Sequence, residues 1–271
     1  MTTPAETQIE RNRLLSELCR MLELMCLHLR DATPASKEHM ELEFRMMTDV
    51  VGVNHTNLAM IRSLIASMES MTKTDPTHWK KVFDAAFYTI YNNSTRRRIY
   101  YHSEKKADGT IPTTHETVIK TPVMDNGEEM QFFVSCANRP TNFRVTLSKE
   151  RMIDHDPAVK QHDAMSVHQR RSFEHCIRGE FGHPSAVVVR YDITKVSKRG
   201  ADKKDIMGEA RYHVEMELVS LPKWIDDPEA RAAQNREVAK LLFQYFCTLM
   251  GPHDENGHLL PPPDLSIVSV K

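Results

Sequence analysis

The stretch HMELEFRMM, residues 39–47, decides which fold the sequence can adopt. Successive side chains of a β-strand point to opposite faces. An extended chain therefore places Glu41, Glu43 and Arg45 on one face and only apolar side chains on the other. The stretch predicts a strand with one charged and one apolar face.

A second stretch, YHVEMELV at residues 212–219, has the same alternation and places His213, Glu215 and Glu217 on one face. Glutamate is depleted in strands, yet two strands far apart in the sequence each carry a Glu-x-Glu pair. Up to four carboxylates can thus converge on one hard cation, and carboxylate oxygens suit Mg²⁺ or Mn²⁺. The alternative is a half-buried antiparallel sheet whose charged face is solvated. That alternative predicts a binding module without catalysis.

Alternation with a period of two continues between residues 95 and 221, in segments rich in Val, Ile, Thr, Phe and Tyr. Asp108-Gly109 and Asn126-Gly127 are typical of the tight turns that join antiparallel strands. The pattern predicts an antiparallel β-barrel with a charged interior and an apolar outer wall covered by helices. The segments are TRRRIYYHSE (95–104), THETVIKTPVM (114–124), EMQFFVSC (129–136), TNFRVTLSKE (141–150), SAVVVRYDITKVS (185–197) and ARYHVEMELVSL (210–221).

Helical periodicity is found outside these segments. Apolar residues recur at steps of three and four over 8–30, 56–71 and 228–250, which predicts three amphipathic helices. Asp75-Pro76 is a helix start signal, so a further helix is expected to run from there through Phe87. The tail after residue 252, which contains three consecutive prolines, is expected to be irregular or disordered.

These expectations combine into a single domain over residues 1–271. The barrel occupies 38–220, with inserted helices at 56–90, and the helices at 8–30 and 228–250 are expected to pack on its exterior. Their apolar stripes also leave open a docking role for one of them.

Composition excludes several classes of protein. The 271 residues carry 36 Lys and Arg against 37 Asp and Glu, which gives a net charge of −1. The composition therefore removes the simplest argument for nucleic-acid binding, a basic surface that attracts phosphates. No stretch approaches the ~18 apolar residues of a membrane span, and the polar N-terminus is not a signal peptide. Five scattered cysteines without a CxxC pair indicate a reducing compartment. Since no glycine-rich phosphate loop is present, side chains must hold any bound phosphate.

Taken in order, the motifs resemble those of the metal-dependent RNA 5′-triphosphatases of fungi, protozoa and some large DNA viruses, which belong to the triphosphate tunnel metalloenzymes. The resemblance covers about residues 38–220. It rests on Glu41-Leu42-Glu43 with Arg45, FRVTLSKE (143–150), QRRSF (169–173), RYDIT (190–194) and VEMEL (214–218).

The resemblance implies an α+β fold with an antiparallel eight-stranded barrel, or tunnel. It also implies hydrolysis of the γ-phosphate from the 5′-triphosphate end of RNA, the first step of mRNA cap formation, with Mg²⁺ or Mn²⁺ as cofactor. Glu41, Glu43 and Glu217 are expected to bind the metal, and Glu215 the same site or its water ligands. The resemblance assigns phosphate oxygens to Arg45, Arg98, Lys120, Arg144, Arg170 and Arg190.

Two acidic residues receive other roles from the resemblance. Glu150 is the candidate to orient or deprotonate the attacking water, with a solvated carboxylate at a strand end as the alternative. Asp192 is expected to orient an arginine rather than to bind metal.

The sequence departs from the family's motifs at two positions. His168 stands where the basic strand usually has a lysine, and His213 stands where the last strand often has a third glutamate. Either histidine would weaken phosphate or metal binding, or make it depend on pH. Arg98 is chosen from the run Arg96-Arg97-Arg98, whose register is open by one or two positions.

The substrate and partners stay open at the level of sequence. A tunnel hydrolase acting on inorganic tripolyphosphate or nucleoside triphosphates would use the same residues. The family places the protein in the nucleus, with 5′-triphosphate RNA as substrate and no membrane contact. An RNA guanylyltransferase or a second copy of the chain is a candidate partner.

Overall fold

The computed structural model describes residues 4–31, 38–47, 55–92, 95–101, 113–136, 142–153, 165–199, 206–249 and 265–268. Three helices lie within these residues: α1 (Pro4–Asp31), α2 (His55–Thr74) and α3 (Pro228–Leu249). The three predicted amphipathic helices are therefore confirmed. None of the described helices is apolar over the length that crossing a bilayer requires.

Most of the remaining described chain is β-structure. The strands are β1 (Glu38–Met47), β2 (Trp79–Asn92), β3 (Thr95–Tyr101), β4 (Thr113–Pro122), β5 (Met124–Asp125), β6 (Glu128–Glu129), β7 (Gln131–Cys136), β8 (Asn142–Ile153), β9 (Met165–Arg178), β10 (Val187–Arg199), β11 (Ile206–Ser220) and β12 (Leu265–Val268).

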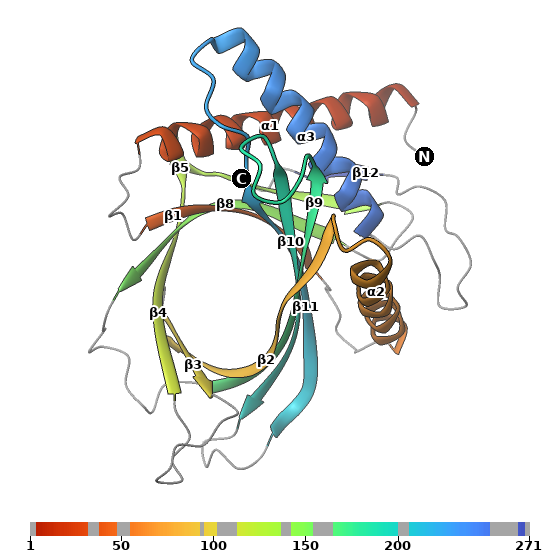
Figure 1. Cartoon of the computed structure of the whole chain (residues 1–271), viewed down its shortest axis with the longest axis vertical. Coiled ribbons are helices and arrows are strands. Elements are labelled where there is room, and N and C mark those ends of the chain that lie inside the picture. The colour runs from red at the N-terminus through yellow and green to blue at the C-terminus, as the bar shows by residue number, and fades with distance from the viewer. Residues whose placement is uncertain are drawn as a thin grey trace.

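Eight antiparallel strands form a closed ring. Hydrogen bonds run in the order β1-β11-β10-β9-β2-β3-β4-β8, and β8 pairs with β1 to close the circle. Figure 1 views the ring end-on. The predicted α+β fold with an antiparallel eight-stranded barrel and external helices is confirmed. Whether the whole chain is a single domain stays a prediction.

Strand β8 belongs to the ring and to an extension of it. Its first half pairs with β7, and its second half pairs with β4. The change occurs at Leu147, whose carbonyl accepts from Val123 N at 3.0 Å and whose N–H donates to Met130 O at 2.9 Å. Strand β12 adds to the far side of β7, so this part of the tail is a strand rather than irregular chain.

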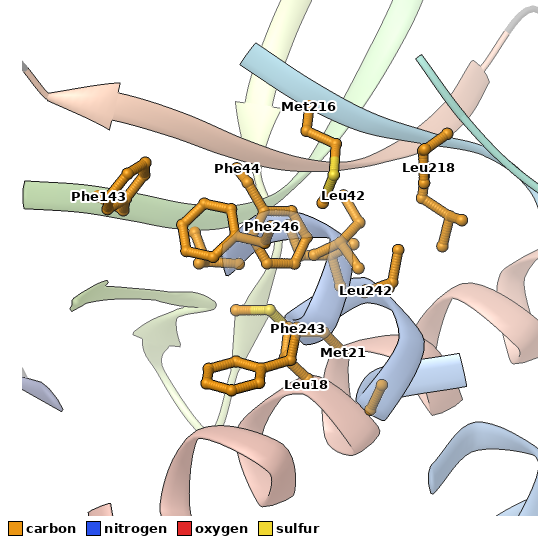
Figure 2. Close-up of a cluster of buried hydrophobic side chains, with 14 of the residues drawn as sticks. Leu18, Met21, Leu42, Phe44, Phe143, Met216, Leu218, Leu242, Phe243 and Phe246 are labelled. Carbon is orange, nitrogen blue, oxygen red and sulfur yellow. The ribbon is translucent and has the colours of Figure 1, made fainter. Parts of the chain in front are cut away.

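The core lies outside the barrel wall, beneath α1 and α3. Figure 1 shows both helices lying across the ring on the side of β1 and β8. Leu42 and Phe44, on the apolar face of β1, are 0% and 2% exposed. In Figure 2 Phe44 lies beside Phe246 of α3, and Leu18 of α1 lies farther from the strand in the same cluster. The ring centroids of Phe44 and Phe246 are 5.0 Å apart. Packing of the two helices on the barrel exterior is therefore confirmed.

The start of α3 agrees with its sequence signal. The Asp227 carboxylate accepts from the backbone N–H groups of Glu229 and Ala230 at 3.3 and 3.2 Å, and Pro228 occupies the first helical position. Arg231 and Asn235 of α3 both donate to Glu23 of α1, at 2.9 and 2.8 Å. These bonds fix α3 against α1 over the barrel.

The helix predicted from Asp75-Pro76 through Phe87 is wrong, so the helical insertion does not extend to residue 90. Helix α2 ends at Thr74, and the chain turns at Asp75, whose carbonyl accepts from Trp79 N at 2.9 Å. The chain then continues as β2. Phe83 and Phe87 are four residues apart, a spacing that places two residues on one face of a helix and equally of a strand. Pairing of β2 with β9 and β3 decides between the two.

The turn predicted at Asn126-Gly127 is confirmed. Both residues have positive φ, 52° and 83°, and the pair joins β5 to β6. Asp108-Gly109, the other predicted turn, lies outside the described residues.

Candidate active site: the charged bore

The bore contains a cavity of about 420 Å³. Its wall receives charged side chains from β1, β3, β4, β8, β9, β10 and β11, because the charged face of each strand points inward. The charged residues that line it are Glu41, Glu43, Arg96, Arg98, Glu116, Glu150, Arg170, Glu174, Arg190, Asp192, Glu215 and Glu217. Three further residues predicted for the site lie next to these lining residues, on the inward faces of their strands: Arg45, Lys120 and Arg144.

The two Glu-x-Glu pairs lie side by side. Strands β1 and β11 are hydrogen-bonded neighbours, with Glu43 directly opposite Glu217 and Arg45 directly opposite Glu215. Glu41 and Glu43 are 8% and 2% exposed, so they do not form a solvated surface. The four carboxylates predicted to converge thus occupy one wall of the bore.

Basic side chains are paired with each of these carboxylates. Lys120 Nζ donates to Glu41 Oε2 at 2.6 Å and to Glu43 Oε2 at 2.9 Å. Arg45 forms ion pairs with Glu43, at 3.0 Å, and with Glu215. Arg190 donates to Glu217. The acidic wall is therefore connected to β4 and β10 by ion pairs.

Two of these carboxylates nevertheless resist ionisation. Burial raises the pKa of Glu41 well above its usual value, and the charge of Glu217 raises it further against the opposing effect of Lys120. Burial also raises the pKa of Glu217 to about 7, although Arg190 opposes the shift. Burial is the main reason that both carboxylates resist ionisation, and the charges of neighbouring carboxylates add to it: Glu217 for Glu41, and Asp192 and Glu150 for Glu217.

The donor set on this wall suits a hard divalent cation. It offers several carboxylate oxygens, which are the ligand type that Mg²⁺ and Mn²⁺ prefer, and a bound cation would favour the ionised forms of Glu41 and Glu217. Within the part of the chain that the structure describes, no three acidic, histidine or cysteine side chains are grouped closely enough to hold one ion. The carboxylates lie instead against Lys120, Arg45 and Arg190.

Glu150 lies beside this wall rather than at a solvated strand end. It is 7% exposed, and Arg96 Nη2 donates to its Oε1 at 3.2 Å. Lys120 Nζ is 3.7 Å from the same oxygen. Burial disfavours the charged form of Glu150, but the charges of Lys120 and Arg96 outweigh burial and lower its pKa. Glu150 is therefore held as a carboxylate.

Strand β3 contributes two inward arginines where the sequence analysis selected one. Arg96 faces Glu150, and Arg98 Nη1 donates to Glu116 at 3.1 Å. Arg97 points to the other side and contacts His115. Arg96 belongs to the run whose register the sequence left open, whereas Glu116 was not predicted as a site residue. The signal for Glu116 was its position four residues before Lys120 on an alternating strand.

Asp192 forms ion pairs with two arginines, and its role in orienting an arginine stays a prediction. Its Oδ2 lies 3.2 Å from Arg170 Nη1 and 3.5 Å from Arg190 Nε, and the carboxylate is 3% exposed. Arg170 also donates to Thr194 Oγ1 at 3.2 Å. The R-x-D-x-T strand therefore holds guanidinium groups from β9 and β10 at fixed positions in the bore.

Arg144 lies next to another arginine. It is directly opposite Arg45 across β8 and β1. Burial and the charge of Arg45 lower the pKa of Arg144. Its buried Nε has no hydrogen-bond acceptor among the described residues. A guanidinium with an unused donor beside a second positive charge suits an anionic ligand.

The two histidines that depart from the family's motifs are neutral in this environment. Burial, reinforced by the charge of Arg170, lowers the pKa of His168 to about 3. Burial also lowers the pKa of His213. His168 therefore does not replace the positive charge of the usual lysine at neutral pH, and His213 does not replace the negative charge of a third glutamate.

Structural comparison finds RNA triphosphatases among the similar folds. The S. pombe RNA triphosphatase Pct1 is 14% identical, with 92% of this chain and 94% of that chain covered and a TM-score of 0.49. The RNA triphosphatase domain of a trifunctional mimivirus mRNA capping enzyme is 13% identical, with 80% and 96% covered and a TM-score of 0.40. Pct1 in complex with the Spt5 CTD gives 13% identity and a TM-score of 0.49, with 86% and 91% covered.

Sequence comparison finds less. No family model matches the chain, and no curated protein matches it.

Proposed function

We propose that the protein is a metal-dependent tunnel phosphohydrolase that removes the γ-phosphate from the 5′-triphosphate end of RNA. The observation that carries the proposal is the adjacency of two Glu-x-Glu strands inside a closed barrel whose other walls supply arginine and lysine. A triphosphate is a chain of negative charges. A site for it needs both a metal to bridge phosphate oxygens and basic groups to neutralise the remainder.

The acidic wall is the proposed metal site. A bound Mg²⁺ or Mn²⁺, held by Glu41, Glu43 and Glu217, would neutralise and polarise phosphate oxygens, with Glu215 at the same site or at its water ligands. A cation there would also relieve the repulsion that raises the pKa of Glu41 and Glu217.

The basic residues are proposed to bind phosphate and to stabilise the charge that develops during transfer. Arg170 and Arg190 are oriented by Asp192, so they can bind phosphate without reorganising. Arg45, Arg98, Lys120 and Arg144 extend the contact around the bore. Phosphoryl transfer depends on such positioning and charge neutralisation more than on covalent help.

Glu150 is proposed to act on the attacking water. Its lowered pKa keeps it ionised, so it can accept a hydrogen bond from water and take up a proton as the water attacks phosphorus. Arg96 holds one of its oxygens at 3.2 Å.

A direct assay tests the proposal. We expect wild-type protein to release γ-phosphate from triphosphate-ended RNA only when Mg²⁺ or Mn²⁺ is present. Glu41→Gln and Glu217→Gln should each lower kcat/KM by about 100-fold or more, because both remove charge from the metal wall. Glu128→Gln, at an exposed carboxylate of β6, is the matched control and should leave the rate unchanged. Unchanged release in both bore variants would refute the metal assignment.

The alternative substrates are inorganic tripolyphosphate and free nucleoside triphosphates. Parallel assays with RNA, ATP and tripolyphosphate separate them. The non-catalytic alternative required solvated glutamates, and the burial of Glu41 and Glu43 contradicts that requirement.

A role in capping gives further expectations. We infer a nuclear location and use of the diphosphate product by an RNA guanylyltransferase, as the resemblance of the motifs implies. A second copy of the chain stays a candidate partner.

A further inference from the structure

One side of the bore is aromatic rather than charged. Phe83 and Phe87 of β2 and Tyr100 of β3 line the same cavity as the glutamates and arginines. Val82, Val118 and Met152 also line the cavity. Apolar surface turned toward a polar cavity is unfavourable in water, so a wall of this kind indicates a ligand with an apolar face.

This aromatic wall, defined as Phe83, Phe87 and Tyr100, lies across the bore from the acidic wall. In the ring of eight strands, β2 is four strands from β1, and β3 is four strands from β11. The metal-binding and aromatic walls therefore face one another. A ligand that spans the bore meets carboxylates at one end and aromatic rings at the other.

Two of the three rings are available to a ligand. The ring of Phe87 is buried, with His168 stacked at 5.2 Å and the Arg170 guanidinium 5.4 Å from its centroid. Phe83 is partly exposed, and its described ring neighbours, Phe87 and Tyr100, meet it at steep angles of 72° and 79°. No described ring is stacked parallel on Phe83, so a planar group of a ligand can stack there.

Charged residues connect the aromatic wall to the phosphate-binding groups. Tyr100 and Arg98 are two residues apart on one face of β3, and both donate to Glu116. Arg98 and Arg170 line the same cavity as Phe83. A planar group stacked on Phe83 would thus be continuous with phosphates held by these arginines.

We propose that the aromatic wall binds the base of the nucleoside that carries the triphosphate, with Phe83 as the stacking surface and Tyr100 at its edge. The inference rests on the proposed function, because it takes a triphosphate to be bound in the bore. It deepens that function by making the preferred substrate a nucleoside 5′-triphosphate, free or at an RNA end, rather than inorganic tripolyphosphate. Every base has a π-face, so the contact selects for a nucleoside without selecting strongly among sequences.

Calorimetry with ligands that are not turned over tests the inference separately from catalysis. The probes are inorganic tripolyphosphate, in the form of its non-hydrolysable imido analogue, and the β,γ-imido analogues of ATP and UTP, all with Mn²⁺. We expect wild type to bind the ATP analogue at least about tenfold more tightly than tripolyphosphate. Phe83→Ala should reduce this ratio about tenfold, and the UTP analogue should lose less because a pyrimidine offers a smaller stacking face.

Matched variants separate stacking from folding. Phe83→Trp keeps an aromatic face and should preserve the selectivity that Phe83→Ala loses. Tyr100→Leu should lower the ratio, whereas Tyr100→Phe keeps the ring and should retain it. Val219→Ala, at an exposed apolar residue outside the cavity lining, should not alter the ratio.

Three results would overturn the inference: wild type that binds both ligands equally, wild type that binds neither, or Phe83→Ala that weakens both ligands to the same extent. Failure of the proposed function has a different signature, which is absence of γ-phosphate release by wild type in the presence of metal.

Discussion

The two faces of strand β1 lie in opposite environments. Glu41 and Glu43 point into the bore among lysine and arginine, whereas Leu42 and Phe44 point into the apolar layer under α1 and α3. The inner face holds charges that repel one another and resist ionisation. The outer face removes apolar surface from water, which is the dominant favourable contribution to folding. The outer face should therefore stabilise the fold, whereas the inner face should perform the chemistry and lower the stability of the protein.

The largest effect on stability is expected from the outer face. Phe44 is 2% exposed and packs 5.0 Å from the ring of Phe246, so Phe44→Ala leaves a cavity. We expect the free energy of unfolding to fall by about 3–5 kcal/mol, as measured by urea denaturation. Glu43→Gln, at the adjacent position on the inner face, is the comparison and should cost much less. Equal losses from both variants would show that the bore also holds the fold together.

A smaller effect of opposite sign is expected from the inner face. The pKa of Glu217 is about 7 in the folded protein, above its ordinary value of 4.5, so the folded state binds more protons than the unfolded state between these pH values. Metal-free stability should therefore fall as pH rises from 4.5 through 7. Glu217→Gln should make the stability depend less on pH, and it should stabilise the metal-free protein at pH 8 by on the order of 1–2 kcal/mol.

Thermal unfolding in the presence of a chelator, recorded from pH 5 to pH 8, measures this difference. A Glu217→Gln variant less stable than wild type at pH 8 would contradict the expectation. It would mean that the ion pair with Arg190 outweighs the cost of burying the Glu217 carboxylate near Asp192 and Glu150.

The outer face should respond to pH with the opposite slope. His175 is stacked on Trp79 with ring centroids 4.0 Å apart, and burial, with a further contribution from His78, lowers the pKa of His175 to about 4. The contribution of neutral His175 to the free energy of unfolding is complete above the pKa of the unfolded state, about 6.5. It is lost as pH falls through 4. His175→Phe keeps the ring contact and should lower the pH of acid unfolding. His183→Phe, at an exposed histidine, is the control, and an equal shift in both variants would count against burial as the cause.

The smallest effect is expected at an exposed ion pair away from both faces. Lys240 donates to Glu237 at 2.7 Å on the solvent side of α3, and both side chains are more than half exposed. Because water screens such pairs, Lys240→Ala should leave the melting temperature unchanged within error. A drop of several degrees would show that α3 depends on surface charge as well as on its apolar stripe.

Residues on clearly alternating strands could be placed from the sequence alone. The period of two puts Glu41 with Glu43, Arg190 with Asp192, and Glu215 with Glu217, and the structure places each pair in the bore. Closure of the ring then makes β1 and β11 neighbours, which alternation cannot specify because the period says nothing about strand order.

Other features carried a weaker signal or none. A four-residue spacing such as that of Phe83 and Phe87 fits helix and strand equally, so β2 and its aromatic wall were missed. Glu116 and Glu174 are single inward acids, without the paired pattern that identified the glutamate motifs. Strand β12 forms only because β7 offers it an unpaired edge, which a local pattern does not reveal.

The pairing of β1 with β11 also sets the order in which the protein can be completed. The first strand of the ring closes against the last, so the chain must be synthesised almost through β11 before a bore exists. Until then, both borders of the growing sheet offer free backbone N–H and C=O groups to any neighbouring chain. A truncated product lacking β11 would therefore be prone to aggregate rather than merely be inactive.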